Sequence, residues 1–162
     1  MKIRDLTRIA LFVAVIIICS YIAVPFVVPI TMQTMGIFIC TLYLGRKKGT
    51  LAILIYVLIG IIGIPVFSGM KGGIGVLLSP TGGYVTGFLL CGYITGLAFE
   101  KTNKAVLSCT LGLISLYAVG TVWFYIVNPV SLWGILSTCV LPFIIPDILK
   151  IFIAVYIKKV LR

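Results

Sequence analysis

Six apolar runs fill most of this 162-residue chain, and short polar stretches separate them. They cover residues 6–24, 32–45, 50–64, 82–99, 105–127 and 132–157. A helix needs about 20 predominantly apolar residues to cross a bilayer. The second and third runs are shorter, so we expect them to be tilted or to extend into the adjoining loops. Two prolines, Pro142 and Pro146, interrupt the last run.

The composition excludes a soluble fold. The chain is 62% hydrophobic and 10% charged, and a soluble domain of this length has too little interior to hold that much apolar surface. The sequence therefore predicts an all-α integral membrane protein with six transmembrane helices. We expect residues 1–162 to form a single domain whose first helix is retained rather than cleaved as a signal peptide.

Basic residues lie at the ends of these runs, which is a pattern of membrane topology. They are Lys2, Arg4 and Arg8 around the start of the first run, Arg46, Lys47 and Lys48 after the second, Lys101 and Lys104 after the fourth, and Lys158, Lys159 and Arg162 at the end. The other connections hold one cation, Lys71. Six crossings with both termini in the cytoplasm put every basic cluster on one side, as the positive-inside rule requires. The net charge of +10 thus indicates membrane orientation, and we expect no nucleic-acid partner.

Few residues are available for catalysis. The chain has no histidine, which excludes histidine-based metal sites and histidine-based acid–base chemistry. Its five cysteines lie within apolar runs without CxxC spacing, and we interpret them as small packing residues. Asp5 and Glu100 lie at membrane edges, where we expect solvated charges. The sequence therefore predicts no enzyme, no metal and no cofactor.

A glycine-rich segment, GMKGGIGVLLSPTGG (69–83), invites comparison with a phosphate-binding loop. Its spacing fits neither GxxxxGK[ST] nor GxGxxG, because Lys71 precedes most of the glycines. Any ATP hydrolysis must then belong to other subunits. Two interpretations stay open: a plain outer connection, or a wall or lid over a binding site.

The most expensive feature is the pair Asp147 and Lys150 within FIIPDILKIF (143–152). Each charge at mid-membrane costs about 2.5–3.5 kcal/mol on insertion scales. A helix that starts near Pro146 places both residues on one face, with its positive dipole end near the carboxylate. The pair then either satisfies itself or presents an acceptor and a donor to a polar ligand. A cyclic urea, with two N–H donors and one carbonyl, complements such a pair.

Four motifs stand in order along the chain: VPITMQTMGIF (28–38), LGRKKG (44–49), IGIPVFSGMKGGIGVLLSPTGGYVTGF (62–88) and LPFIIPDILK (141–150). Together they resemble the BioY family of biotin-binding subunits of energy-coupling-factor (ECF) transporters. The resemblance implies an S-component-like bundle in a prokaryotic plasma membrane, with an outward-facing biotin site. It also implies three partner subunits, a transmembrane coupling subunit and two ATPases, although some members act alone.

The resemblance also implies roles for individual residues. Asp147 and Lys150 match the element that clamps the ureido ring, and Gln33 with Thr31 stands in PITMQT, where these side chains either bind ligand or cap a helix. Tyr84 is a candidate to pack on the bicyclic ring, although an interfacial tyrosine needs no ligand. Lys71 and Ser68 are weaker candidates for the valerate carboxylate.

Ala10 and Ala14 form an AxxxA pair on the first run. Small residues four apart let helices approach closely in lipid, so this pair docks the coupling subunit or packs within the chain's own bundle. Three functional alternatives remain: an S component for another vitamin, a self-sufficient proton-coupled porter, and a structural subunit without ligand. An acid beside a lysine is a poor proton carrier, because the cation keeps it ionised.

Overall fold

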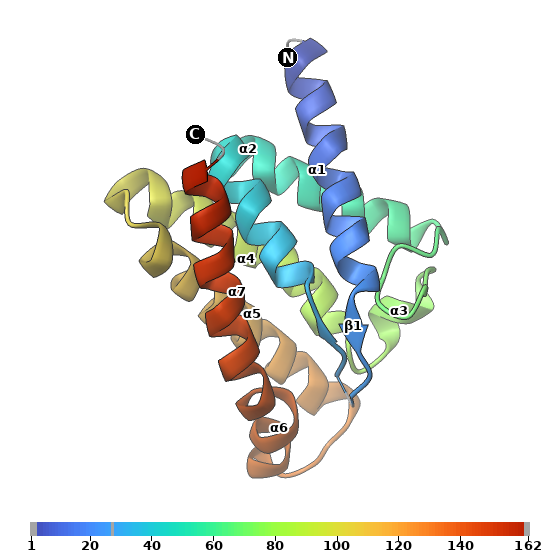
Figure 1. Cartoon of the computed structure of the whole chain (residues 1–162). Coiled ribbons are helices and arrows are strands. Elements are labelled where there is room, and N and C mark those ends of the chain that lie inside the picture. Colours follow the sequence, from blue (N-terminus) through green and yellow to red (C-terminus); the bar gives the residue numbers. More distant parts are fainter. Residues whose placement is uncertain (1–2, 27, 161–162) are drawn as a thin grey trace.

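The computed structural model describes residues 3–26 and 28–160, which are mostly helical (Figure 1). In chain order the elements are α1 Ile3–Tyr21, β1 Ala23–Val24, β2 Ile30–Thr31, α2 Gln33–Ile61, α3 Gly75–Leu78, α4 Gly82–Thr102, α5 Ala105–Val127, α6 Leu132–Cys139 and α7 Leu141–Val160. The two strands pair antiparallel in a short hairpin between α1 and α2, which the all-helical prediction missed. Two of the predicted cations, Lys2 and Arg162, lie outside the described residues.

The second and third apolar runs form one helix, α2, with a sharp kink rather than two helices joined by a loop. Gly45 has φ 79° and ψ 174° inside it, a conformation that a residue with a side chain rarely adopts. The helix resumes immediately through Arg46, Lys47 and Lys48, because lysine and arginine are good helix formers. Figure 1 shows the two halves of α2 running in different directions on either side of this point.

The last apolar run is interrupted as predicted, but at a different residue. The break lies at Val140, between α6 and α7, and Pro146 stands inside α7. Pro142 occupies the first turn of α7, where a missing N–H costs nothing. The prediction that a helix starts near Pro146 is therefore wrong.

Within the described residues, three stretches are long and apolar enough to cross a membrane: Gly82–Thr102, Ala105–Val127 and Trp133–Val160. Helices α1 and α2 are not among these three stretches, because charged residues lie within α1 and in the middle of α2. The count of six crossings therefore stays a prediction.

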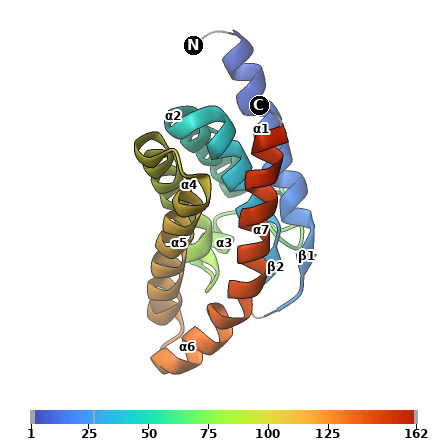
Figure 2. The same cartoon turned by 60° about the vertical axis from the view of Figure 1, so that its left-hand side comes forward.

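Helix α4 packs between α2 and α5, and small residues make this close approach possible. A Cβ on Gly96 of α4 would lie 2.5 Å from the Cα of Arg46, so only glycine fits there. Helix α7 packs mainly on α2, while α6 extends away from the bundle at the opposite end from the termini (Figures 1 and 2).

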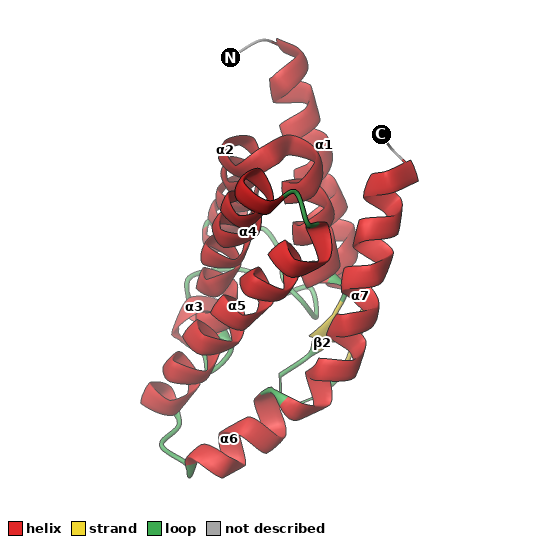
Figure 3. Ribbon diagram, turned by 90° about the vertical axis from the view of Figure 1, so that its left-hand side faces the viewer, coloured by secondary structure: helices red, strands yellow, loops and turns green. Residues whose placement is uncertain are grey.

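Both described ends of the chain lie at the same end of the molecule, together with the α2 kink and the α4–α5 turn (Figures 2 and 3). Ion pairs hold this end together. Lys48 Nζ lies 2.7 Å from Asp5 Oδ1, and Arg46 Nε lies 3.3 Å from Glu100 Oε2. Each acid therefore joins two helices. The Asp5 side chain is only 21% exposed, less solvated than expected, whereas Glu100 is 46% exposed, as expected.

Candidate functional site

A cavity of about 200 Å³ lies between the β-hairpin, the start of α2, the segment 67–81, and helices α4, α5 and α7. Apolar and aromatic side chains form most of its lining, and a few polar groups converge on it, which is typical of a small-molecule site. All seven residues predicted to bind ligand line it: Thr31, Gln33, Ser68, Lys71, Tyr84, Asp147 and Lys150.

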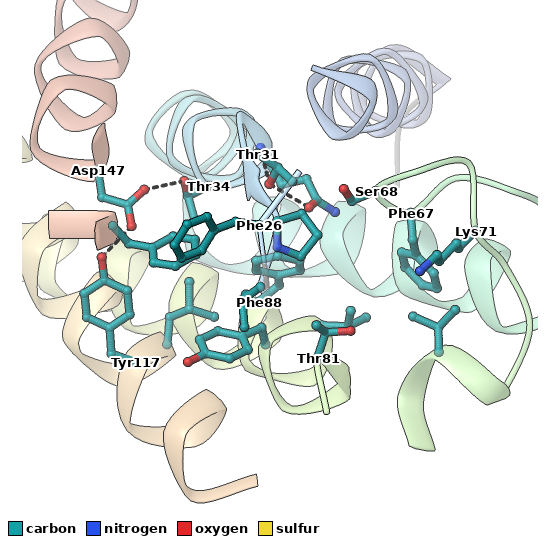
Figure 4. A pocket seen from close by; sticks show the side chains of 18 of the residues that line it. Phe26, Thr31, Thr34, Phe67, Ser68, Lys71, Thr81, Phe88, Tyr117 and Asp147 are labelled. Atoms are coloured by element: carbon teal, nitrogen blue, oxygen red, sulfur yellow. Dashed lines mark hydrogen bonds between the residues drawn. The ribbon is translucent and has the colours of Figure 1, made fainter. Parts of the chain in front are cut away.

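Asp147 is the centre of a buried polar cluster at one end of the cavity (Figure 4). Its Oδ1 accepts from Lys150 Nζ at 2.6 Å and from Thr34 Oγ1 at 3.2 Å. Its Oδ2 accepts from the Tyr117 hydroxyl at 2.5 Å. The carboxylate, only 2% exposed, is thus held by α2, α5 and its own helix. These three contacts set the position and orientation of the carboxylate.

The predicted support from a helix dipole is absent. Asp147 lies nearly two turns past the start of α7, and a dipole acts mainly within the first turn. Side-chain donors take over that role, because a buried carboxylate needs them where water is missing.

Lys150 is bonded to Asp147, as the i, i+3 spacing predicted, yet it retains donor capacity. An ammonium group has three hydrogens, and among the described residues Lys150 Nζ makes one hydrogen bond. The side chain is 3% exposed and lines the cavity, so its remaining hydrogens have no bulk water to bind. An acceptor on a ligand would satisfy them.

Thr31 and Gln33 lie where the hairpin meets α2, and they bond to each other. The Thr31 hydroxyl donates to Gln33 Oε1 at 2.7 Å and accepts from the Gln33 backbone N–H at 3.3 Å. Gln33 Nε2 donates to the Tyr56 hydroxyl at 2.6 Å. The Thr31 hydroxyl therefore satisfies the backbone N–H of Gln33, although the N-cap residue of α2, Met32, makes no side-chain cap hydrogen bond, and both Thr31 and Gln33 line the cavity.

Aromatic side chains line the cavity between its polar ends. Phe26 and Phe88 lie near its middle in Figure 4. Tyr84 is buried, and its hydroxyl donates to the Cys139 carbonyl at 3.4 Å. That bond turns the hydroxyl toward α6 and leaves the ring as the part of Tyr84 available to a ligand.

Ser68 and Lys71 lie at the end of the cavity away from Asp147 (Figure 4). Lys71 belongs to the glycine-rich segment 69–83, whose residues Val76 and Thr81 also line the cavity, and Phe67 and Ser68 directly precede that segment. This region is thus a wall of the cavity rather than only a connection. Phe67 and Lys71 pair through their backbones, and Gly69 between them has φ 71°.

Sequence reasoning missed two residues of the buried polar cluster around Asp147, namely Thr34 and Tyr117. Thr34 directly follows Gln33, and Tyr117 is a hydroxyl in the middle of an apolar run. A buried hydroxyl in a membrane helix is a usable signal. It is ambiguous here, because the same run also contains Ser108, Ser115 and Thr121.

A family model described as the BioY family matches residues 1–162. The chain belongs to the BioY family. It is 40% identical to a probable biotin transporter BioY of Pyrococcus horikoshii, over 100% of this chain and 98% of the relative. A biotin transporter BioY of Thermotoga maritima is 37% identical, over 98% and 96%.

A solved structure has the same fold. The S-component for biotin from an ECF-type ABC transporter matches with a TM-score of 0.92 at 30% identity, over 99% of this chain and 92% of that chain. The BioY relatives are named as transporters and not as enzymes. Together with the three apolar helices, membership of this family makes the chain a membrane protein.

In this BioY protein Ala10 and Ala14 are both exposed on α1, while the opposite face of the helix, with Ile9, Val13 and Ile16, is buried. The pair therefore does not pack within the chain's own bundle. Its outward position leaves it available to lipid or to another subunit.

Proposed function

We propose that this chain is the biotin-binding subunit of an ECF-type transporter and takes part in biotin uptake across a prokaryotic plasma membrane. The single observation that carries the proposal is the buried Asp147–Lys150 pair at one end of an otherwise apolar cavity. A buried ion pair contributes little net stability, so a ligand explains its presence better than the fold does. Membership of the BioY family supports biotin as that ligand.

In the proposed complex the ureido ring lies against the buried polar cluster around Asp147. Asp147 accepts from ureido N–H groups, and the unused hydrogens of Lys150 bind the ureido carbonyl. Gln33 and Thr31 line the same cavity and supply further polar contacts to the ligand in this pose. The apolar rings and tail of the ligand pack on Tyr84 and the aromatic walls. Such a pose uses each polar group of the cavity without leaving a buried charge unpaired.

The valerate carboxylate extends toward the other end of the cavity in this pose. Lys71 supplies a positive charge there and Ser68 a hydroxyl. Lys71 is exposed, so its attraction to the carboxylate is screened by water and contributes modestly to affinity. We therefore assign specificity mainly to the ureido end.

We also propose a single membrane domain, residues 1–162, with six crossings and both termini in the cytoplasm. The kink at Gly45 supports this topology, because it lets the two halves of α2 cross separately. A second support is the common location of both termini, the basic α2 kink and the α4–α5 turn at one end. Lipid then surrounds the exposed apolar faces of the helices.

Transport energy comes from partners in this proposal: a transmembrane coupling subunit and two ATPases. The glycine-rich segment lacks the spacing of a nucleotide-binding motif, as argued above. The exposed Ala10 and Ala14 face is where we place the coupling subunit, since small residues permit close helix contact.

Calorimetric titration of the detergent-solubilised chain with biotin tests the substrate. We expect tight one-to-one binding, and weaker binding of biocytin, in which the free carboxylate is blocked. If a folded sample binds another vitamin but not biotin, that vitamin replaces biotin as the proposed substrate, and the proposed fold is unaffected.

Uptake into vesicles tests the energy source. Uptake that follows ATP and needs the partner subunits supports the proposal. Uptake by the chain alone that follows a pH gradient would instead indicate a self-sufficient proton-coupled porter. Both arms use the same vesicles, so a leaky preparation is recognised by loss of both.

A further inference from the structure

Pro65 and Val66, just before the residues 67–71 that include part of the cavity lining, are held by a set of hydrogen bonds that we call the anchor. The Val66 carbonyl oxygen accepts from Ser20 Oγ at 2.6 Å and from the Tyr56 hydroxyl at 3.2 Å. The neighbouring Pro65 carbonyl accepts from the Tyr21 hydroxyl at 2.9 Å. Two consecutive carbonyls of one segment are therefore held by side chains from α1 and α2.

The anchored segment leads directly into residues that line the cavity. Phe67 and Ser68 follow Val66, and Lys71 closes the small hairpin through backbone bonds of 3.0 and 3.3 Å to Phe67. Val66 and Phe67 are each 2% exposed, whereas Met70 at the tip is 70% exposed. The base is thus fixed and the tip is in the open. We call residues 65–71 the outer wall.

Two of the anchoring side chains, Ser20 and Tyr21, are the last residues of α1. Ser20 is completely buried, and its hydroxyl also lies 2.7 Å from the Ile17 carbonyl of its own helix. It therefore shares one proton between its own helix and the outer wall. A serine that served only its helix would not need to face Val66.

We propose that Ser20, Tyr21 and Tyr56 are positioning residues that fasten the outer wall to α1 and α2 and thereby set the rate at which biotin leaves. The first part rests on the hydrogen bonds alone, and the second rests on the proposed function. Ser68 and Lys71 stand on this wall, so every opening of the wall removes them from the carboxylate end of the cavity.

The anchor also links the wall to the exposed face of α1. Ala10 lies ten residues before Ser20, which is about 15 Å along a continuous helix. Any displacement of α1 by a subunit bound at Ala10 and Ala14 is carried to Pro65 and Val66. By linkage, a subunit that changes biotin affinity in this way must itself bind differently when biotin is present.

Hydrogen exchange of the ligand-free protein tests the anchor. In Ser20→Ala and in Tyr21→Phe we expect the Phe67 and Lys71 amides to exchange about 2- to 10-fold faster, the effect of one lost neutral hydrogen bond. Tyr21 is 44% exposed, so its variant removes a hydroxyl without opening a cavity in the core. Amides of α4 and α5 should be unaffected.

The matched control is Ser115→Ala. Its hydroxyl donates at 2.6 Å to Gly112, within its own helix, as Ser20 does to Ile17, and the structure gives it no bond to the outer wall. Wall exchange should be unchanged in this variant. Unchanged wall exchange in both Ser20→Ala and Tyr21→Phe would overturn the anchor.

Biotin dissociation tests the functional part. We expect both variants to release biotin faster by about the same factor as their wall exchange, and to bind it faster as well, because biotin enters and leaves through the same opening. Faster exchange with unchanged dissociation would overturn the gating role. If the parent chain binds no biotin at all, the proposed function and the gating role fall together, and the exchange results alone decide the anchor.

Discussion

The substitution Asp147→Asn offers the sharpest test of the site. It nearly preserves the shape of the side chain but replaces one acceptor oxygen with a donor. That oxygen either faces a ureido N–H or one of the three groups that now donate to Asp147, namely Lys150, Thr34 and Tyr117. Facing a ureido N–H or the Lys150 ammonium, the new amide donor meets another donor, whereas the Thr34 and Tyr117 hydroxyls can turn and accept from it. In each case a charge-assisted bond is lost.

The expected magnitude follows from these contacts. A hydrogen bond to a charged group contributes about 1.5–3 kcal/mol, so biotin should bind roughly 10- to 150-fold more weakly. The same change leaves the ammonium of Lys150 buried at 3% exposure without its counter-charge. Breaking a buried pair in this way costs about 3–5 kcal/mol of unfolding free energy.

A second variant separates weak binding from poor folding. Asp147→Asn combined with Lys150→Gln removes both charges, and we expect it to recover much of the lost thermal stability. Its biotin affinity should stay low, because the ureido partners are still missing. The control Asp5→Asn also ends an ion pair with a lysine, Lys48 at 2.7 Å, but in the first turn of α1, and Asp5 is not among the residues that line the cavity.

Thermal unfolding in detergent and calorimetric titration with biotin give the two quantities for each variant. Unchanged affinity in folded Asp147→Asn would refute the role of Asp147 as a ligand. A loss of affinity in Asp5→Asn as large as in Asp147→Asn would show that the assay reports general destabilisation. A double variant that recovers stability and also binds biotin tightly would assign the pair to the fold rather than to the ligand.

Three further predictions concern other parts of the site. Tyr117→Phe removes one bond to Asp147 and should weaken biotin binding about 2- to 10-fold by calorimetry; unchanged binding would make Tyr117 a packing residue. Lys71→Gln should reduce the preference for biotin over biocytin, because its charge serves the carboxylate; an unchanged preference would remove Lys71 from the site. Ala10→Trp should abolish ATP-driven uptake in vesicles while leaving biotin binding intact, whereas Ala118→Trp on the exposed surface of α5 should preserve both; lost binding in Ala10→Trp would instead indicate internal packing.

Helix positions were predictable where polarity and helix propensity change at the same residue. The run 105–127 coincides with α5, because the poor helix formers Asn103 and Asn128 end α4 just before it and α5 itself. The run 82–99 ends too early, because Glu100 and Lys101 are polar but also good helix formers, and α4 continues to Thr102. Asn103 then stops it in a left-handed conformation, with φ 54°.

Predictions made from charge and proline alone were less reliable. The cluster Arg46–Lys48 suggested a loop, yet the backbone change needed to turn α2 is confined to Gly45. Pro146 suggested a helix start, but Pro142 already occupies the first turn of α7. In both cases the sequence indicates that the helix is disturbed but not at which residue. In α2 the backbone conformation decides it, because φ 79° favours a glycine.

The candidate binding residues were predictable where their burial in a membrane helix costs free energy. Asp147 and Lys150 stand out because nothing in a lipid-facing helix accounts for a charge, and their spacing alone brings them together. Thr34 and Tyr117 carry no charge, so placing them in a membrane helix costs little free energy and does not mark them in the sequence. Only the fold brings them from α2 and α5 to the same carboxylate. The same holds for Ser20, whose partner Val66 lies 46 residues away along the chain. The sequence therefore reveals charged residues that a lipid-facing helix does not account for. The hydroxyls that orient those charges, and the wall of the cavity beside them, can be identified only from the arrangement of the helices.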